Sequence, residues 1–305
     1  MDQIDMQLNY DIDNIVERIS LDKKSFVQSA EKNYKQGVEA ITKQIAKNIS
    51  EKNLLLVCGP SSSGKTTTSN IIVNTLANLG ISALVVSMDN FFIEREETPL
   101  LPNGAKDYDN VKTINIELFK KCLNELIEKG TTKLPIFDFI TGHRQDDVVE
   151  VTMRKNMVII VEGLHVLNPL CISQAMQQKA IKIFVCPKSG FNKNNKTLIS
   201  STSLRFTRRM IRDFCSRGYS VNETEINWQG VIDAEKQFIT PYKKDADFII
   251  DTTHAYEPFL YNQKMLELLE KDRDFAKYIV KDIPKTELTS NDISSISLIW
   301  EFLGA

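Results

Sequence analysis

Residues 58–68, which read CGPSSSGKTTT, carry the clearest chemistry in the sequence. Residues 59–66 fit the pattern G-x-x-x-x-G-K-[ST] between an apolar run and a helical segment, which is the context the pattern requires. Glycines let backbone N–H groups turn toward phosphate oxygens, and a helix N-terminus adds positive potential. The pattern therefore predicts a nucleoside triphosphate site. Its phosphate cradle is expected to comprise Gly59, Ser61, Ser62, Ser63, Gly64, Lys65, Thr66 and Thr67.

Two acids at strand ends predict a magnesium site beside this cradle. Lys65 is expected to reach the β- and γ-phosphates and the Thr66 hydroxyl to bind Mg²⁺. Glu162 follows the apolar run MVIIV, and Asp89 follows ALVVSM. Carboxyl ends of parallel strands meet at the ligand-binding edge of a sheet, so both acids should face the phosphates. Asp89 is also a candidate general base for an acceptor hydroxyl. Either acid taken alone could instead cap the following turn.

The basic stretch LRFTRRMIRDFCSRG helps to decide whether the terminal phosphate is transferred to water or to another acceptor. At about 100° per residue, Arg205, Arg208, Arg209 and Arg212 fall on one stripe of a helix. Phosphoryl transfer depends on positioning and charge neutralisation, so this helix could close as a lid over the phosphates, with Arg212 acting on the transferred group. The alternative is a solvated face paired with acids such as Asp213. A GTPase is disfavoured because NKNNK lacks the aspartate of a base-reading motif.

Strand-sized apolar runs alternate with helical segments around these residues. Apolar runs predict five strands, NLLLVCG, ISALVVSMD, KNMVIIVEG, AIKIFVCP and ADFIIDTT. The alternation predicts an α/β three-layer sandwich with a mostly parallel five-stranded sheet. We expect an N-terminal helical extension at 1–50, a nucleotide-binding domain at 51–265 with a lid at about 188–220, and a C-terminal helical extension at 266–305. Within this plan 23–50 should form an amphipathic helix, and 94–113 and 187–203 should be loops, the second of them mobile.

Composition excludes several other classes. The chain has 305 residues, 42% hydrophobic and 26% charged, with a net charge of −2, which argues against a general nucleic-acid or membrane-surface binder. No apolar run is long enough to span a membrane, and the acidic N-terminus lacks the core of a secretory signal. Five cysteines without CxxC pairing indicate reduced thiols in a cytoplasmic protein rather than a metal site.

Several motifs in order resemble the uridine kinase and phosphoribulokinase family. They are GPSSSGKTT, SMDNFF, YDNVKTINIELF, PIFDFITGHR, VIIVEGLHVLNP, RFTRRMIRDFCSRG and PYKKDADFII. The resemblance runs from about Ser25 to the C-terminus. It is greatest to a bacterial uridine kinase-like branch that often follows a TGS domain, absent here, and that closes on an EFIGG-like tail, which here reads WEFLGA.

The resemblance implies a role for matching residues of this chain. Thr66, Asp89 and Glu162 match the Mg²⁺-site residues, and Asp89 also matches the catalytic carboxylate. Arg212 matches a phosphate-contacting arginine of the lid. On the acceptor side, Asp109 within the run Tyr108-Asp109-Asn110 matches the carboxylate that holds ribose hydroxyls, with Arg209 beside it, and Arg144 matches an arginine of the base-side loop.

The chain departs from the uridine–cytidine kinase pattern where a pyrimidine would be read. Residues 89–92 read DNFF where D-x-F-Y is typical, and 137–144 read FDFITGHR where Y-D-F-x-x-H-x-R is typical. Two tyrosine hydroxyls are thus replaced by the rings of Phe92 and Phe137, and the histidine position holds Gly142. A pocket without hydrogen-bonding partners for the base loses discrimination, although both rings could still stack on it.

The sequence therefore predicts an ATP-dependent kinase, with Mg²⁺ and either ATP or GTP, that phosphorylates the 5′-hydroxyl of a nucleoside. A kinase of another small alcohol, or a regulatory nucleotide-binding module, remains open. His143 could replace the missing histidine or be an ordinary loop residue. The resemblance also hints at a homo-oligomer; no nucleic-acid or membrane partner is expected.

Overall fold

The computed structural model describes residues 9–101 and 104–304, so the first eight residues of the expected N-terminal extension and the last residue of the C-terminal one lie outside it. Its centre is a five-stranded parallel sheet with the strand order β10-β7-β2-β6-β3. These strands are β2 (Leu54–Cys58), β3 (Ser82–Ser87), β6 (Met157–Gly163), β7 (Ala180–Cys186) and β10 (Phe248–Asp251). All five were predicted from the apolar runs, and the parallel arrangement confirms the predicted fold class.

Alternate residues of the central strands build two separate cores, one on each face of the sheet. Leu55 and Val57 pack on one face with α1 (Ile12–Ala46) and α2 (Lys65–Asn78). Leu54 and Leu56 pack on the other face, with α3 (Ile116–Glu128) and α4 (Gln174–Lys179). Burial on both faces explains why the strands appear in the sequence as continuous apolar runs rather than alternating ones.

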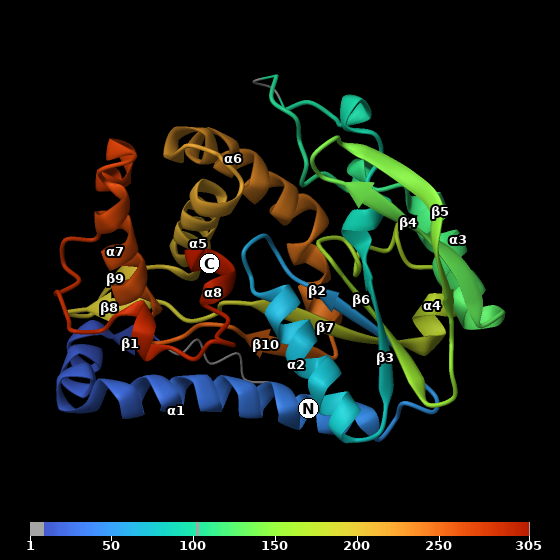
Figure 1. The fold of residues 1–305 in the computed structure, drawn as a ribbon, viewed down its shortest axis with the longest axis horizontal. Helices are drawn as coiled ribbons and strands as arrows, with labels where there is room; N and C mark the ends of the chain where they lie inside the picture. Colours follow the sequence, from blue (N-terminus) through green and yellow to red (C-terminus); the bar gives the residue numbers. More distant parts are fainter. Residues whose placement is uncertain (1–8, 102–103, 305) are drawn as a thin grey trace.

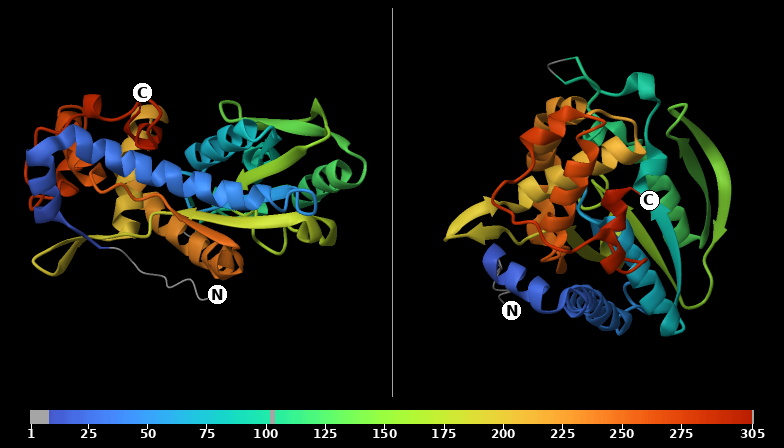
Figure 2. Two further views of the ribbon diagram at one scale, coloured as in Figure 1. Left: turned by 90° about the horizontal axis from the view of Figure 1, so that it is seen from below. Right: turned by 60° about the vertical axis from the view of Figure 1, so that its left-hand side comes forward.

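Helix α1 runs along most of the length of the molecule (Figures 1 and 2). It is interrupted at Asp22, where φ is −160° and ψ is 89°, and the Asp22 carboxylate accepts a hydrogen bond from the Ser25 N–H at 3.0 Å. The predicted helix at 23–50 therefore corresponds to the second part of α1. Its first part, with Ile12, Ile15 and Ile19, packs into a third core built by the C-terminal half of the chain.

This third core unites three further helices with the C-terminal segment. The helices are α5 (Ser201–Ser216), α6 (Val221–Phe238) and α7 (Glu257–Leu268). Beyond α7 the chain forms short turns and the one-turn helix α8 (Trp300–Leu303), whose Phe302 is fully buried. No helix in the described ranges has the length and hydropathy needed to cross a membrane.

Two small sheets were not predicted. β4 (Thr131–Asp138) and β5 (His143–Thr152) form an antiparallel hairpin beside α3. The segment expected as a mobile loop at 187–203 instead contains β8 (Phe191–Lys193) and β9 (Lys196–Ile199), joined by Asn194 and Asn195 at φ of 50° and 60°. Two residues at positive φ give the turn type that favours a tight hairpin. Strand β1 (Tyr10–Asp11) pairs parallel to β8, so the loop expectation was wrong.

Candidate active site

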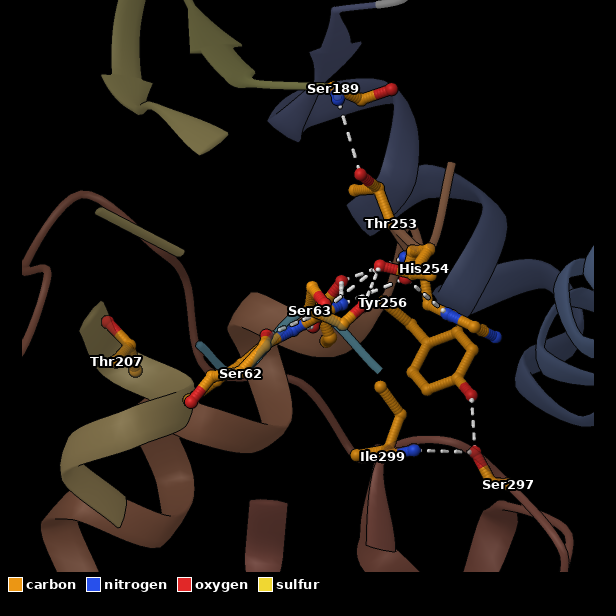
Figure 3. Close-up of polar contacts among 12 residues, drawn as sticks. Ser62, Ser63, Ser189, Thr207, Thr253, His254, Tyr256, Ser297 and Ile299 are labelled. Carbon is orange, nitrogen blue, oxygen red and sulfur yellow. Dashed lines mark hydrogen bonds and ion pairs between the residues drawn. The ribbon is translucent and has the colours of Figure 1, made fainter. Parts of the chain in front are cut away.

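The glycine-rich loop lies between β2 and α2 and has the backbone shape of an anion nest. Ser62 and Gly64 have positive φ, 58° and 87°, a pattern of alternating backbone that turns successive N–H groups inward. Gly59 is required by space, because a Cβ there would lie 2.1 Å from the carbonyl oxygen of Val185 on β7. The buried hydroxyls of Ser62 and Ser63, both labelled in Figure 3, have no hydrogen-bond partner within the described chain. The loop thus keeps polar groups that a phosphate could satisfy.

Lys65, Thr66 and Glu162 meet at the head of α2. The Lys65 ammonium donates to the carbonyls of Gly59 at 2.9 Å and Pro60 at 3.2 Å. The Thr66 hydroxyl donates to the Glu162 carboxylate at 3.2 Å. Glu162 stands near the end of β6, opposite Ser87 of β3, and Asp89 follows two residues beyond Ser87. The structure therefore brings the predicted phosphate and metal residues to one edge of the sheet.

The pKa values of both strand-end acids, Asp89 and Glu162, are raised. Burial raises the pKa of Asp89, Asp109 raises it further, and Lys65 and Arg217 act against both. Burial also raises the pKa of Glu162, with Asp89 adding repulsion, while Lys65 and the hydrogen bond from Thr66 lower it. A divalent cation would relieve that repulsion, and carboxylate and hydroxyl oxygens are the ligands Mg²⁺ prefers. The donor set at Thr66, Asp89 and Glu162 fits magnesium.

The arginines of α5 divide into two groups. Arg205 and Arg208 are nearly or fully buried and donate to the backbone carbonyls of Ser61 and Ser62 at 3.4 and 3.3 Å. Arg208 also forms a buried ion pair with Glu257 at 2.8 Å. These two arginines fasten α5 to the glycine-rich loop, so the alternative of a solvated face does not hold for them.

The other arginines gather around one buried carboxylate. Asp213 accepts a hydrogen bond from Arg212 at 2.8 Å. It also forms ion pairs with Arg209 at 3.2 Å and with Arg217, just past the end of α5, at 3.4 Å. Burial lowers the pKa of Arg212, and Asp213 opposes that shift. These three guanidinium groups outnumber the carboxylates paired with them, Asp213 and Asp109, which leaves an excess of positive charge. Arg217 also lowers the pKa of Asp89, against the larger effect of burial. Such a field suits developing charge on a transferred phosphoryl group.

Asp109 connects the acceptor side to the phosphate side through Arg209. The Arg209 guanidinium lies 3.7 Å from the Asp109 carboxylate and donates to the Ser61 hydroxyl at 2.8 Å. Asp109 is buried, with 9% of its surface exposed, whereas its neighbour Tyr108 is 42% exposed. A single side chain, that of Arg209, therefore links the predicted diol-binding acid Asp109 to the glycine-rich loop.

Phenyl rings gather at the predicted base side. The rings of Phe92 and Phe137 lie edge to face with centroids 5.5 Å apart. Phe139, which was not predicted, contacts both, at 6.2 Å from Phe92 and 5.1 Å from Phe137, and is 58% exposed. The two predicted base-side rings, Phe92 and Phe137, thus lie in one cluster, and the exposed Phe139 extends this cluster to solvent.

The β4–β5 turn next to these rings is fastened by Arg95, a residue that the sequence reasoning missed. Its guanidinium donates to the carbonyls of Phe139 and Ile140, and its backbone N–H donates to Gly142. Gly142 has a φ of 81°, and a Cβ there would lie 2.6 Å from the Arg95 Nε. A side chain at Gly142, where the resembled pattern has histidine, would therefore have to displace Arg95 and adopt a strained backbone conformation.

His143 and Arg144 point to the segment that carries Arg95. The His143 Nδ1 lies 2.7 Å from the Glu94 carboxylate, which raises the pKa of the exposed imidazole. Arg144 donates to the carbonyl of Phe92 at 2.7 Å and to Asp146 at 2.6 Å. Both residues therefore hold the hairpin against residues 92–94 and thereby fix the phenyl cluster.

Two further residues escaped the sequence reasoning although both lie in quoted motifs. His165 in VEGLH is 2% exposed, and burial lowers its pKa to about 4 despite the nearby Asp109. Glu301 in WEFLGA accepts a hydrogen bond from the Thr67 hydroxyl at 2.8 Å. Neither motif offered a partner at a recognisable spacing, because each contact joins segments far apart in the chain.

A parallel sheet whose central strand leads into an anion nest, with acids at the ends of two neighbouring strands, defines a P-loop nucleotide-binding protein. Residues 54–256 match the model of the Phosphoribulokinase / Uridine kinase family, and the chain belongs to that family. It is therefore a small-molecule kinase with an alcohol group as acceptor, of a kind that uses ATP with Mg²⁺.

Individual relatives agree with this assignment. A uridine kinase of Ligilactobacillus salivarius is 32% identical over 202 residues, which are 64% of this chain and 82% of that protein. A uridine kinase of Clostridium novyi is 28% identical over 198 residues, covering 65% and 86%. Among solved structures, one described as a fructose transport system kinase from Silicibacter sp. TM1040 superposes with a TM-score of 0.52 at 19% identity. It covers 70% of this chain and 98% of that one, and it supports the fold.

Proposed function

We propose that the acceptor is the 5′-hydroxyl of a ribonucleoside and that ATP is the phosphoryl donor. The observation that carries this proposal is the chain of contacts from Ser61 through Arg209 to Asp109. A buried carboxylate suits a vicinal diol, because each ribose hydroxyl can donate to one carboxylate oxygen. Because only the Arg209 side chain separates Asp109 from the glycine-rich loop, a ribose bound at Asp109 would present its 5′-hydroxyl toward the phosphates. The uridine kinases among the relatives support the same class of acceptor.

In this proposal each residue of the phosphate side has one task. The N–H groups of the glycine-rich loop and the Lys65 ammonium hold the phosphates, and Thr66, Asp89 and Glu162 hold Mg²⁺, which when bound neutralises phosphate charge. Asp89, whose pKa is raised by burial, accepts the proton of the acceptor hydroxyl as it attacks. Arg212 and its neighbours around Asp213 stabilise the charge that develops on the transferred group.

The base side supports a nucleoside kinase with weak base discrimination. Phe92, Phe137 and Phe139 offer ring faces and edges for stacking but no hydroxyl that could read a pyrimidine edge. Gly142 offers no imidazole, and the guanidinium of Arg95 is engaged with backbone carbonyls. We therefore infer that both pyrimidine and purine ribonucleosides are accepted. The same observations make a small alcohol other than a nucleoside the second candidate.

Comparing ribose with deoxyribose acceptors tests the proposal. With Mg²⁺ and ATP, kcat/KM should be about 10- to 100-fold higher for ribonucleosides than for 2′-deoxyribonucleosides, since a site built to bind a hydroxyl rejects its absence. Asp109→Asn should remove most of this preference while leaving the KM for ATP nearly unchanged. Asp107→Asn, at a neighbouring acid in the same loop, is the matched control. Equal rates with both sugars in the wild-type protein would contradict the proposed diol site.

A further inference from the structure

Two segments outside residues 54–256, the part that matches the family, converge on the first turn of α2. From the N-terminal side, the Tyr34 hydroxyl of α1 lies 2.7 Å from the Thr68 hydroxyl. From the C-terminal side, Glu301 of α8 accepts from Thr67. The family's own elements therefore do not complete the surroundings of this turn; flanking segments of this chain do.

The C-terminal segment is held firmly at this place. Leu298 packs on the glycine-rich loop so closely that a Cβ at Gly64 would lie 2.5 Å from its Cδ1. The Ser297 hydroxyl lies 3.4 Å from the Tyr256 hydroxyl and accepts from the Ile299 N–H at 3.2 Å (Figure 3). The Arg208 guanidinium lies 4.7 Å from the centroid of the buried Phe302 ring. The Glu301 carboxylate is thus fixed by packing on both sides of it in the sequence.

Glu301 engages both donors of a residue that the sequence places in the phosphate cradle. One oxygen of its carboxylate accepts from the Thr67 hydroxyl at 2.8 Å and lies 3.4 Å from the Thr67 backbone nitrogen. N–H groups in the first turn of a helix lack partners within the helix and are the groups that bind phosphate. Each of these donors carries one hydrogen, so a phosphate oxygen and Glu301 cannot both receive it in full.

The carboxylate of Glu301 also adds negative charge to the site. It lies against Thr67, next to Thr66, whose hydroxyl donates to the Glu162 carboxylate. A phosphate placed at the head of α2 would meet this charge together with those of the two strand-end acids. Removing the negative charge of Glu301 should therefore strengthen the binding of a phosphate anion.

We propose that Glu301 belongs to the nucleotide site and sets its affinity, by competing with a phosphate of a nucleoside di- or triphosphate for Thr67. The C-terminal segment thereby lowers the affinity for nucleotide, because it places the Glu301 carboxylate beside Thr67 of the phosphate cradle. The inference concerns nucleotide binding alone and does not depend on which alcohol is phosphorylated.

Calorimetric titration with MgADP and MgATP, without any acceptor, tests this inference. Glu301→Gln and Glu301→Ala should each bind nucleotide roughly tenfold more tightly than the wild type, the order expected from one charge a few Å away, and the gain should shrink with added salt. Glu270→Gln removes the same charge from an exposed turn just beyond the C-terminal end of α7 and should leave affinity unchanged.

Thermal unfolding without nucleotide identifies the folded variants, and Glu301→Gln keeps the size of the side chain so that packing is preserved. Unchanged or weakened nucleotide binding in Glu301→Gln would overturn the inference, because Glu301 would then only support the helix end. Tightening in both Glu301 variants, with none in the control, would establish it.

Discussion

Replacing Arg208 by methionine should lower the free energy of unfolding strongly, although Arg208 belongs to a stripe of arginines that would ordinarily face solvent. Both Arg208 and Glu257 have no exposed side-chain surface, and they are joined by two hydrogen bonds of 2.8 and 2.9 Å. Arg208 also donates to the Thr252 carbonyl at 2.8 Å. The variant leaves Glu257 as a buried charge without its guanidinium partner, although the His254 N–H still donates to it. Breaking a buried pair in this way costs about 3–5 kcal/mol.

Urea unfolding followed by far-UV circular dichroism measures this loss. Arg217→Met is the matched control, because its partly exposed pair with Asp213 is worth less than about 1 kcal/mol. Adding Glu257→Gln to Arg208→Met should recover part of the stability, since the second change removes the unpaired charge. A loss below about 1 kcal/mol for Arg208→Met would refute the reasoning that Arg208 holds the loop by a buried pair.

Three further predictions concern the two sides of the site. Asp89→Asn should lower kcat by at least about 100-fold while the Kd for MgATP stays within about threefold, and near-normal turnover would remove Asp89 as the base. Gly142→Ala should raise the KM for the acceptor several-fold with little change in the KM for ATP, because a Cβ at φ of 81° meets Arg95; equal effects on both KM values would argue against this. The imidazole of His143 should titrate above its ordinary pKa of 6.5 by NMR and return toward it in Glu94→Gln. Since Glu94 favours the charged imidazolium, the ion pair should be formed below pH 6.5 and be lost as the pH rises through the raised pKa of His143. A titration midpoint of His143 at its ordinary value would contradict the contact.

The five central strands and the phosphate cradle could be predicted because their signals are local. Strands such as Leu54–Cys58 are buried on both faces and therefore contain only apolar residues. The cradle is a short pattern whose glycines are each required by backbone shape or space, as at Gly59 and Gly64. The β4–β5 hairpin lacked such a signal, because β5 is mostly exposed and its residues follow no burial pattern.

The arginine stripe shows where local spacing stops being informative. Helical periodicity placed Arg205, Arg208, Arg209 and Arg212 on one side of α5, as the structure has them. It could not show that Arg208 is buried against Glu257, which lies 49 residues further along. In the same way, the partner of Thr67 lies 234 residues away at Glu301. Long-range pairs of this kind leave no periodic trace in one sequence.

Identifying the phosphorylated product tests the central claim most directly. The protein, with Mg²⁺ and ATP, is given equal amounts of uridine, cytidine, adenosine, guanosine, glycerate and pantothenate, and products are identified by mass and by ³¹P NMR. We predict nucleoside monophosphates with the phosphate on the 5′-oxygen, from more than one base, and formation at least about 100-fold slower with Asp89→Asn. A product made only from a non-nucleoside alcohol, or no phosphorylated product from a protein that binds ATP, would contradict the account.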